Sequence, residues 1–491
     1  MYRSLMFATV CATALLNIQF VSDALGQEVA SALVREGDAL PGDVLGDSIN
    51  SISNTAAARS SGYAFTVTTE DIAGTLFANV WGNVDGGPGE VLASEGILGD
   101  LEITGLEGFF GLSDIGRTCY GTTSTNLDTM VTGLDGVFRD NTLLLNGDDS
   151  VPSLPGYFST FNSRPGITAD GQPYWVGGIT DVFGTGTADR VLFLGTDAVP
   201  VLRGGDPIMG MMDVVLPESL DFDSRFSACG SNYIALVEVT SGDDVMIMNG
   251  EVLETDGVLI RAGNEIPASA GGIGDSFDNF DFMNVTETGS YMVTGDSDGA
   301  TATDEFVMID GEIVMREGDV VGPGVIDGAI EGAFMNEDGN WAAIWDVDIA
   351  AGNVEALIFN GELLLTEGQP VDWNGDGVID DSDQNAEIEN FTGISALTMT
   401  RVDNAGILSI YFTADCDVNG VTLEGGFEVR VPGNPILLAD LNDDGSVNLL
   451  DVAPFVKVLN SSIYHPAADL NSDNQVNLLD VDALITIFNG G

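Results

Sequence analysis

The sequence predicts an all-β protein: a seven-bladed β-propeller-like repeat domain over residues 27–434, followed by a small α-helical module over residues 435–491. Runs of Val, Ile, Phe and Tyr alternate with Gly, Asp and Asn turns along the first part. Two short phrases also recur seven times each along it. The second part contains two nearly identical acidic dodecapeptides, and an apolar pattern of helical spacing follows each copy.

Residues 1–26 read as a secretory signal peptide. Arg3 lies in a short positive region, an apolar run extends over about 5–16, and small residues surround the predicted cleavage site after Gly26. The apolar run is too short for a transmembrane anchor, which needs roughly 20 apolar residues. We therefore expect a secreted or cell-surface attached protein without membrane insertion.

The charge of the chain limits its partners. The sequence has 14 Lys+Arg against 77 Asp+Glu, a formal net charge of -63. Nucleic acids and anionic membranes are repelled by such a protein. The same charge favours divalent counter-ions, of which Ca²⁺ is the obvious candidate.

The supply of histidine and cysteine excludes several chemistries. The single histidine, His465, lies beside Pro466 in the linker between the two C-terminal helix patterns, so Ser-His-Asp and Cys-His catalysis have no histidine base in the repeat domain. Cleavage of the signal peptide would leave Cys119, Cys229 and Cys416, which allow at most one disulfide. No CxxC or Cys/His cluster is present to bind zinc.

The repeat is visible when one phrase is followed along the chain. Its copies are 50 to 59 residues apart: REGD at 35–38, SEGI at 94–97, LNGD at 145–148, RGGD at 203–206, RAGN at 261–264, REGD at 316–319 and TEGQ at 366–369. A second phrase places Gly before an apolar strand, beginning at Ser61, Ile115, Asp170, Cys229, Thr288, Asp338 and Ala405. We interpret the first phrase as turn chemistry rather than as a ligand motif, since a binding residue has no reason to recur in every unit.

The best preserved copies contain an Asx-Gly hairpin, as in 304–319 and 355–369. Asp-Gly and Asn-Gly between strands are signals for type I′ turns. A unit of about 55 residues with room for four strands is typical of a propeller blade. A β-solenoid and stacked sandwiches are the alternatives. Trp175, Trp341 and Trp345 lie in apolar strands and are expected between blades.

The two ends of the repeat region complement each other. The last copy ends with GFEVRVPG at 426–433, where the other copies continue into a strand that ends in REGD. That strand is found at the start of the region, as SALVREGD at 31–38. We expect the ring to close by pairing these segments, because an open sheet edge invites aggregation.

The two C-terminal dodecapeptides, 440–451 and 469–480, match a calcium loop of the EF-hand type. Such a loop supplies oxygen ligands from positions 1, 3, 5, 7, 9 and 12 and turns at a glycine at position 6. The first loop offers Asp440, Asn442, Asp444, Ser446, Asn448 and Asp451. The second offers Asp469, Asn471, Asp473, Gln475, Asn477 and Asp480, with Asn474 in place of the glycine.

An apolar helix pattern follows each loop. Leu450, Phe455, Val456 and Leu459 form the first face, and Leu479, Leu484, Ile485 and Phe488 form the second. This duplicated unit resembles a dockerin type I module, with an NLLD phrase similar to that of secreted proteins from planctomycete-type bacteria. The resemblance implies an EF-hand-like, Ca²⁺-dependent domain that docks to a cohesin-like partner. Dockerins often carry Ser-Thr at loop positions 10 and 11. Leu449-Leu450 and Leu478-Leu479 therefore imply either a more apolar partner surface or a partner other than an orthodox cohesin.

A third loop with the same spacing lies inside the last repeat, at 372–383. Its predicted ligands are Asp372, Asn374, Asp376, the Val378 carbonyl, Asp380 and Asp383, with Gly377 at position 6. No convincing helix pattern follows, so we expect a Ca²⁺-binding insertion in a loop of the β domain. Trp373, at the variable second position, is expected at the surface.

Two functions remain open from the sequence. The repeat domain could be a non-catalytic module that binds an extracellular ligand such as a polysaccharide. Alternatively, it could be a carbohydrate-active enzyme, a glycoside hydrolase or a lyase. Glycosidase chemistry needs two carboxylates about 5 to 10 Å apart, and the sequence does not identify them among 77 acidic residues.

Overall fold

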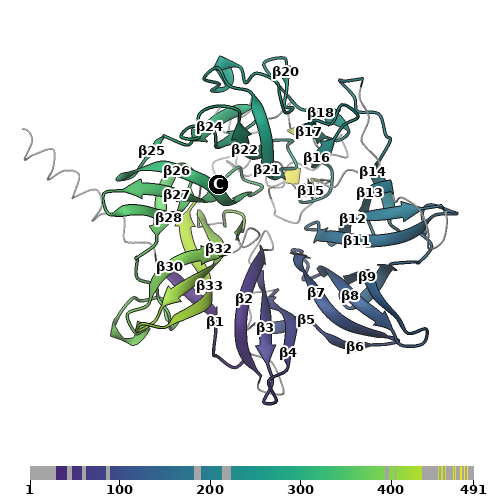
Figure 1. Ribbon diagram of the computed structural model, residues 1–491, viewed down its shortest axis with the longest axis horizontal. Helices are drawn as coiled ribbons and strands as arrows, with labels where there is room; N and C mark the ends of the chain where they lie inside the picture. The colour runs from purple at the N-terminus through teal and green to yellow at the C-terminus, as the bar shows by residue number, and fades with distance from the viewer. Residues whose placement is uncertain are drawn as a thin grey trace, which may run out of the picture.

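The computed structural model describes residues 29–40, 47–57, 62–84, 89–181, 189–212, 223–392, 397–403 and 405–433, together with isolated positions between 452 and 484. Seven antiparallel sheets stand around a central axis like the blades of a propeller (Figure 1). The predicted fold class is therefore confirmed for the repeat domain. The boundary at 434/435 lies outside the described residues and stays a prediction.

Each of the first six blades consists of strands that follow one another along the chain. Blade 1 contains β2 (Ser48–Ala57), β3 (Tyr63–Glu70), β4 (Leu76–Asn83) and β5 (Glu90–Ser94). Blade 2 contains β6 (Gly96–Leu98), β7 (Leu101–Leu112), β8 (Thr118–Asn126), β9 (Val131–Arg139) and β10 (Thr142–Asn146). Blade 3 contains β11 (Phe158–Ile167), β12 (Pro173–Thr180), β13 (Asp189–Leu194) and β14 (Val199–Arg203). Blade 4 contains β15 (Asp223–Phe226), β16 (Tyr233–Glu238), β17 (Asp244–Met248) and β18 (Glu251–Val252).

The remaining blades complete the ring. Blade 5 contains β21 (Phe277–Val285), β22 (Tyr291–Ser297), β23 (Phe306–Ile309) and β24 (Glu312–Arg316). Blade 6 contains β25 (Val320–Val321), β26 (Gly324–Met335), β27 (Trp341–Ile349), β28 (Gly352–Phe359) and β29 (Glu362–Thr366). Blade 7 contains β30 (Glu387–Thr392), β31 (Thr398–Met399), β32 (Ile407–Asp417), β33 (Thr422–Pro432) and β1 (Ala30–Arg35). A hairpin of β19 (Glu254–Thr255) and β20 (Val258–Leu259), and the 3₁₀ turns η1 (Ala268–Ala270) and η2 (Asp381–Asp383), lie between them.

The predicted Asx-Gly hairpins have the expected backbone. Asp310 and Gly311 have φ angles of 51° and 83°, and Asn360 and Gly361 have 48° and 82°. Positive φ at both central residues is what a type I′ turn requires. The turns therefore match the right-handed twist of the strands that they connect.

The ring closes as the sequence predicts. β1 pairs antiparallel with β33, with Ala30 opposite Val429 and Arg35 opposite Gly425. In Figure 1 the first strand lies beside the last one, although almost the whole propeller separates them in sequence. Blade 7 is thus built from both ends of the repeat region.

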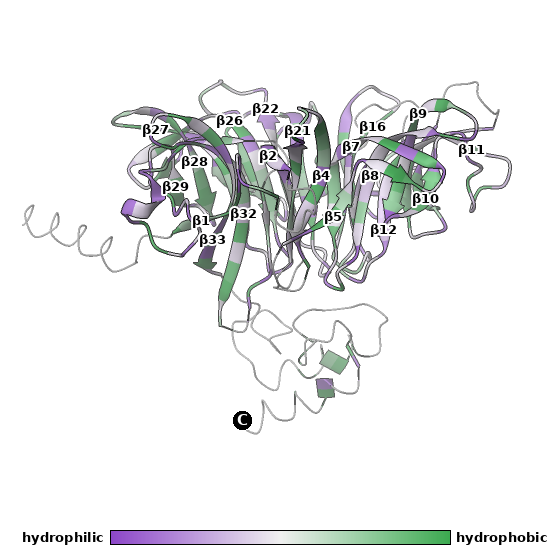
Figure 2. Ribbon diagram, turned by 90° about the horizontal axis from the view of Figure 1, so that it is seen from below, coloured by the Kyte–Doolittle hydropathy of each residue, from purple (hydrophilic) through white to green (hydrophobic). Residues whose placement is uncertain are grey.

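The hydrophobic core is divided among the contacts between neighbouring blades. Seven clusters of buried side chains each combine residues from two consecutive blades, and together they go once around the ring. Trp175 packs between blades 2 and 3, while Trp341 and Trp345 pack between blades 5 and 6. All three side chains are buried, as predicted. Viewed from the side, the blade strands carry most of the apolar colouring (Figure 2).

Candidate functional site

The 372–383 loop connects β29 to β30 and folds around its first residue. The Asp372 carboxylate is fully buried and accepts hydrogen bonds from the amides of Gly375 (2.8 Å), Asp376 (3.1 Å) and Gly377 (2.6 Å). Gly375 and Gly377 have φ angles of 77° and 88°, a conformation that L side chains rarely adopt. The glycines therefore allow the chain to turn tightly around one carboxylate.

The end of the loop is held by its last residue. Asp383 is buried and accepts from the amides of Asn374 (3.1 Å) and Asp380 (2.6 Å), while Asp380 caps η2 through the Ser382 amide. The element after η2 is the strand β30, so an α-helix does not follow the loop, as expected. The six predicted ligand positions thus lie in one compact turn. The atoms that they would offer to a metal ion are all oxygens, the type of ligand atom that Ca²⁺ prefers.

The second C-terminal loop shows the same local bonding at its last position. Asp480 is fully buried and accepts from the amides of Leu470 and Asn477, both at 2.8 Å. Asn477 and Asp480 are loop positions 9 and 12, as are Asp380 and Asp383 in the 372–383 loop. Two loops far apart in sequence therefore end with the same carboxylate-to-amide bond.

Most of the C-terminal predictions fall outside the described residues. This applies to Asp440, Asn442, Asp444, Ser446, Asn448, Asp451, Asp469, Asn471, Asp473 and Gln475. Among the described positions, Phe455, Ala468 and Leu484 form a small buried cluster. Val456, which the sequence places on the apolar face of the first helix, is 47% exposed and lies outside this cluster.

The 372–383 loop also contacts the strand that closes the ring. The Ala32 amide donates to the Asp372 carbonyl (2.9 Å), and the Asp372 amide donates to the Ala30 carbonyl (3.0 Å). Arg35 donates to the Trp373 carbonyl at 2.8 Å. Trp373 is only 4% exposed and packs against Phe427 of β33 with ring centroids 6.1 Å apart. The prediction that Trp373 lies at the surface is therefore wrong: its side chain belongs to the core of blade 7.

The central cavity lies on the propeller axis and has a volume of about 740 Å³. Residues of β7, β11, β15, β21 and β26, together with 397–401, line it. Six blades therefore contribute to the cavity among the described residues. Its lining includes aromatic side chains (Phe109, Phe110, Phe226, Phe280, Phe282, Phe334 and Tyr174) and charged ones (Arg164, Arg225, Arg401, Asp223, Asp281 and Glu331).

Arginines and carboxylates are paired in this cavity. Arg164 and Arg225 both approach the Asp223 carboxylate, and the Arg164 guanidinium lies 5.6 Å from the centre of the Phe109 ring. Arg401 donates to Asp338 at 3.0 Å. An arrangement of aromatic faces and fixed polar groups suits a ligand that has both apolar faces and hydroxyl groups.

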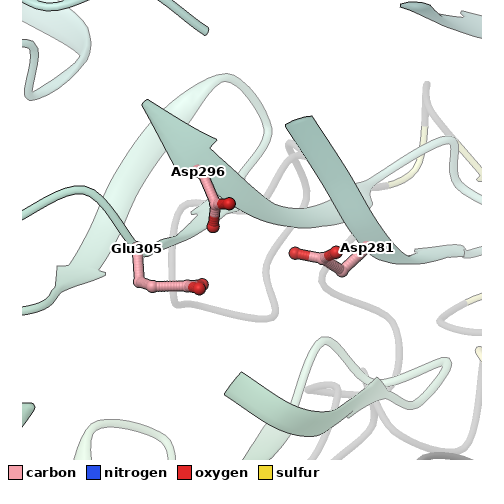
Figure 3. Close-up of side chains that lie close together, drawn as sticks. All are labelled: Asp281, Asp296 and Glu305. Carbon is pink, nitrogen blue, oxygen red and sulfur yellow. The ribbon is translucent and has the colours of Figure 1, made fainter. Parts of the chain in front are cut away.

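A carboxylate cluster, made of Asp281, Asp296 and Glu305, lies at the edge of the cavity. Carboxylate oxygens of the three residues lie within 4.8 Å of one another. Figure 3 shows the three side chains pointing toward one another from neighbouring segments of blade 5. Asp281 also lines the central cavity. The buried Oδ1 of Asp296 and Oε2 of Glu305 accept no hydrogen bond from the described residues.

The electrostatics of the cluster favour a bound proton or cation. Burial and the neighbouring Asp296 carboxylate raise the pKa of Asp281 to about 6. Burial, with Asp296 again the main neighbour, raises the pKa of Glu305 to about 9. Carboxylates this close cannot all be ionised without compensation. At neutral pH the cluster therefore retains a proton unless a cation replaces it.

Sequence reasoning missed the carboxylate cluster and the cavity. A weak signal existed, because Asp281 stands directly between two aromatic residues, Phe280 and Phe282. Cys119 and Cys416 are buried free thiols, and burial raises the pKa of both. These two residues are therefore structural.

The geometry defines a seven-bladed β-propeller-like protein with a tight acidic turn at 372–383 before the last blade. Residues 438–489 match the family model described as Dockerin type I domain. The chain thus carries a dockerin type I domain C-terminal to the propeller. Domains of this family bind calcium and dock to cohesin modules. No curated protein matches the chain.

Several solved structures are similar to this chain at low identity. The α-L-arabinofuranosidase Arb93A from Fusarium graminearum has 9% identity and a TM-score of 0.29, covering 83% of this chain and 98% of that one. A protein of unknown function from Dyadobacter fermentans has 10% identity and a TM-score of 0.27, with coverages of 81% and 98%. The gluconolactonase XC5397 from Xanthomonas campestris has 13% identity and a TM-score of 0.24, with coverages of 83% and 92%.

Among the described residues, no helix has the length and apolar character needed to cross a membrane.

Proposed function

We propose that this is a secreted, calcium-binding protein whose propeller binds an extracellular polysaccharide and whose C-terminal domain docks to a cohesin-like partner. The observation that carries the proposal is the dockerin type I match at 438–489. Export depends on the signal peptide predicted at 1–26, and the proposed domains are 27–434 and 435–491.

The proposed metal is Ca²⁺ at three loops: 372–383, 440–451 and 469–480. The donor sets consist of carboxylates, amide oxygens and main-chain carbonyls, which suit a hard cation. In the 372–383 loop, turns at Gly375 and Gly377 and the buried Asp372 and Asp383 support this assignment. Among the described residues, three carboxylates lie close enough to share a metal ion only in blade 5. The carboxylates of the 372–383 loop would therefore have to move closer together when Ca²⁺ binds.

The central cavity is the proposed ligand site. Its half-buried aromatic side chains (Phe109, Phe226, Phe282 and Phe334) offer ring surface for stacking with a sugar, and its ion-paired arginines and carboxylates offer fixed hydrogen-bonding groups. An unpaired row of arginines would favour a polyanion, whereas here Asp223 and Asp338 compensate them. The cavity chemistry therefore favours a neutral or weakly charged glycan.

Retention of the full-length protein on a panel of immobilised polysaccharides tests the ligand site. We expect retention on at least one of them, and weaker retention for Glu331→Ala, because Glu331 is an exposed side chain in the cavity wall. Glu312→Ala, at an exposed position on β24 outside the cavity lining, is the matched control. Equal retention of both variants would reject the cavity as the site. Native electrophoresis with cohesin modules, in Ca²⁺ and in chelator, tests the docking separately.

A second candidate function is a glycoside hydrolase or lyase, favoured by the position of Asp281. This carboxyl lines the cavity, and burial together with the neighbouring Asp296 carboxylate raises its pKa to about 6, as a general acid requires. Released reducing ends from the same panel, lost in Asp281→Asn, would establish catalysis. Retention without release by the wild-type protein would leave binding as the function.

A further inference from the structure

Strand β1 is held from two sides by segments near the other end of the chain. On one side it pairs with β33, and the register of this ladder shifts between Ala32 and Val34. On the other side Ser31 forms a parallel bridge with Asp372, through the two main-chain hydrogen bonds between Asp372 and the residues flanking Ser31. The 372–383 loop is therefore the second edge partner of the closing strand.

Further contacts tie the loop to the same strand. Arg35, at the end of β1, donates to the Trp373 carbonyl at 2.8 Å. A Cβ atom on Gly375 would lie 2.6 Å from the Ala32 carbonyl oxygen, so the loop backbone touches β1 closely. Trp373 belongs to the same buried cluster as Ala30 and Ala32. The loop and the strand thus form one packed unit.

Asp372 belongs to both halves of this unit. Its main chain pairs with β1, while its carboxylate collects the amides of 375–377 and is the first predicted calcium ligand. The loop also contains the carboxylates of Asp376, Asp380 and Asp383 within twelve residues. Without a cation these carboxylates repel one another, which favours loop conformations that differ from the one paired with β1.

We propose that Ca²⁺ in the 372–383 loop fastens the closing strand β1, so that closure of the propeller ring depends on calcium. The inference rests on the calcium site proposed above for this loop. A ligand that binds only the closed form stabilises that form by mass action. Removal of the ion frees the loop, and β1 loses one of its two edges.

Hydrogen exchange of the full-length protein measures this closure directly. We expect the amides of residues 29–36 to exchange about 100-fold more slowly at a Ca²⁺ concentration 100 times the dissociation constant than in chelator. Amides of β12, on the far part of the ring, should change little and serve as the internal reference. Asp376→Asn should remove most of the calcium effect, because it removes the charge of a predicted Ca²⁺ ligand. Asp376 bonds within the loop and not to β1, so the substitution leaves the hydrogen bonds of the strand in place.

Asp71→Asn is the matched control. Asp71 is another turn carboxylate, partly exposed, that accepts main-chain hydrogen bonds from Ala73 and Thr75 in blade 1. This variant should keep the full calcium effect on residues 29–36. If Asp71→Asn and Asp376→Asn behave alike, the effect arises from general charge screening and the proposal is wrong.

Terbium binding separates the two levels of the proposal. Tb³⁺, a luminescent substitute for Ca²⁺, should be excited through Trp373, and Trp373→Phe should remove this signal. Terbium luminescence together with slowed exchange in β1 supports the fastening role. Luminescence with unchanged exchange refutes that role and leaves the calcium site in place. Absence of both overturns the calcium site and the fastening role with it.

Discussion

Replacement of Glu305 by Gln should stabilise the protein increasingly as the pH rises. Burial beside Asp296 raises the pKa of Glu305 from 4.5 to about 9. The folded state therefore holds a proton that the unfolded state releases above pH 4.5, so stability is complete at lower pH and is lost as pH rises toward 9. Gln has nearly the same shape and needs no proton.

The magnitude follows from the width of that interval. One pKa unit corresponds to about 1.36 kcal/mol, so two pH units inside the interval cost at most about 2.7 kcal/mol. Glu305 is only partly buried, and solvent screening reduces the expected loss to about 1–2 kcal/mol. Between pH 5.5 and 7.5, the wild-type free energy of unfolding should fall by this amount more than that of Glu305→Gln.

Urea denaturation followed by near-ultraviolet circular dichroism, at several pH values in chelator, measures both profiles. Glu312→Gln, at an exposed position on β24, is the control and should follow the wild type. Parallel profiles for wild type and Glu305→Gln would show that Glu305 is ionised in the folded protein. In that case the description of the carboxylate cluster as a proton-sharing group is incorrect.

Three further predictions concern stability. Arg316→Met should lower the free energy of unfolding in urea by about 3–5 kcal/mol, because it leaves the buried Asp275 without its ion-pair partner at 2.6 Å. Arg117→Met, at a half-exposed ion pair, should lower it by less than about 1 kcal/mol. Equal effects would contradict the role of burial. Gly375→Ala should lower the melting temperature more than Gly377→Ala. Both glycines have positive φ, but only a Cβ at 375 meets β1. A larger decrease for Gly377→Ala would reject that contact. Chelation of calcium should unfold the C-terminal domain while most of the β signal in circular dichroism persists, and simultaneous loss of both signals would contradict the proposed domain boundary.

The fold could be predicted because its information is repeated along the chain. Seven copies of two phrases determine the blade number, and Asx-Gly pairs determine the hairpins that Asp310-Gly311 and Asn360-Gly361 form. Ring closure was predictable because the final repeat lacks a strand that the segment 31–38 supplies. The tight turn at 372–383 could be located because its spacing of acidic residues and glycines is local in sequence, while its binding of Ca²⁺ stays a prediction.

The central cavity could not be predicted in the same way. Its lining combines single positions from six blades, and each of these positions is ordinary within its own repeat. Asp281, Asp296 and Glu305 come together only when β21 and β22 pair and the chain returns toward β23. Trp373 was placed wrongly because loop spacing says nothing about which side of the loop faces β33.

The position of β33 has a mechanical consequence. This strand leads toward the dockerin domain, and it is paired along both edges, with β32 on one side and β1 on the other. A pull on a docked tail would reach the propeller through a strand that two ladders restrain, rather than through a free edge that peels away one bond at a time. If the protein is held by its C-terminal domain, the strand that bears the load is the one that also pairs with the first strand of the propeller.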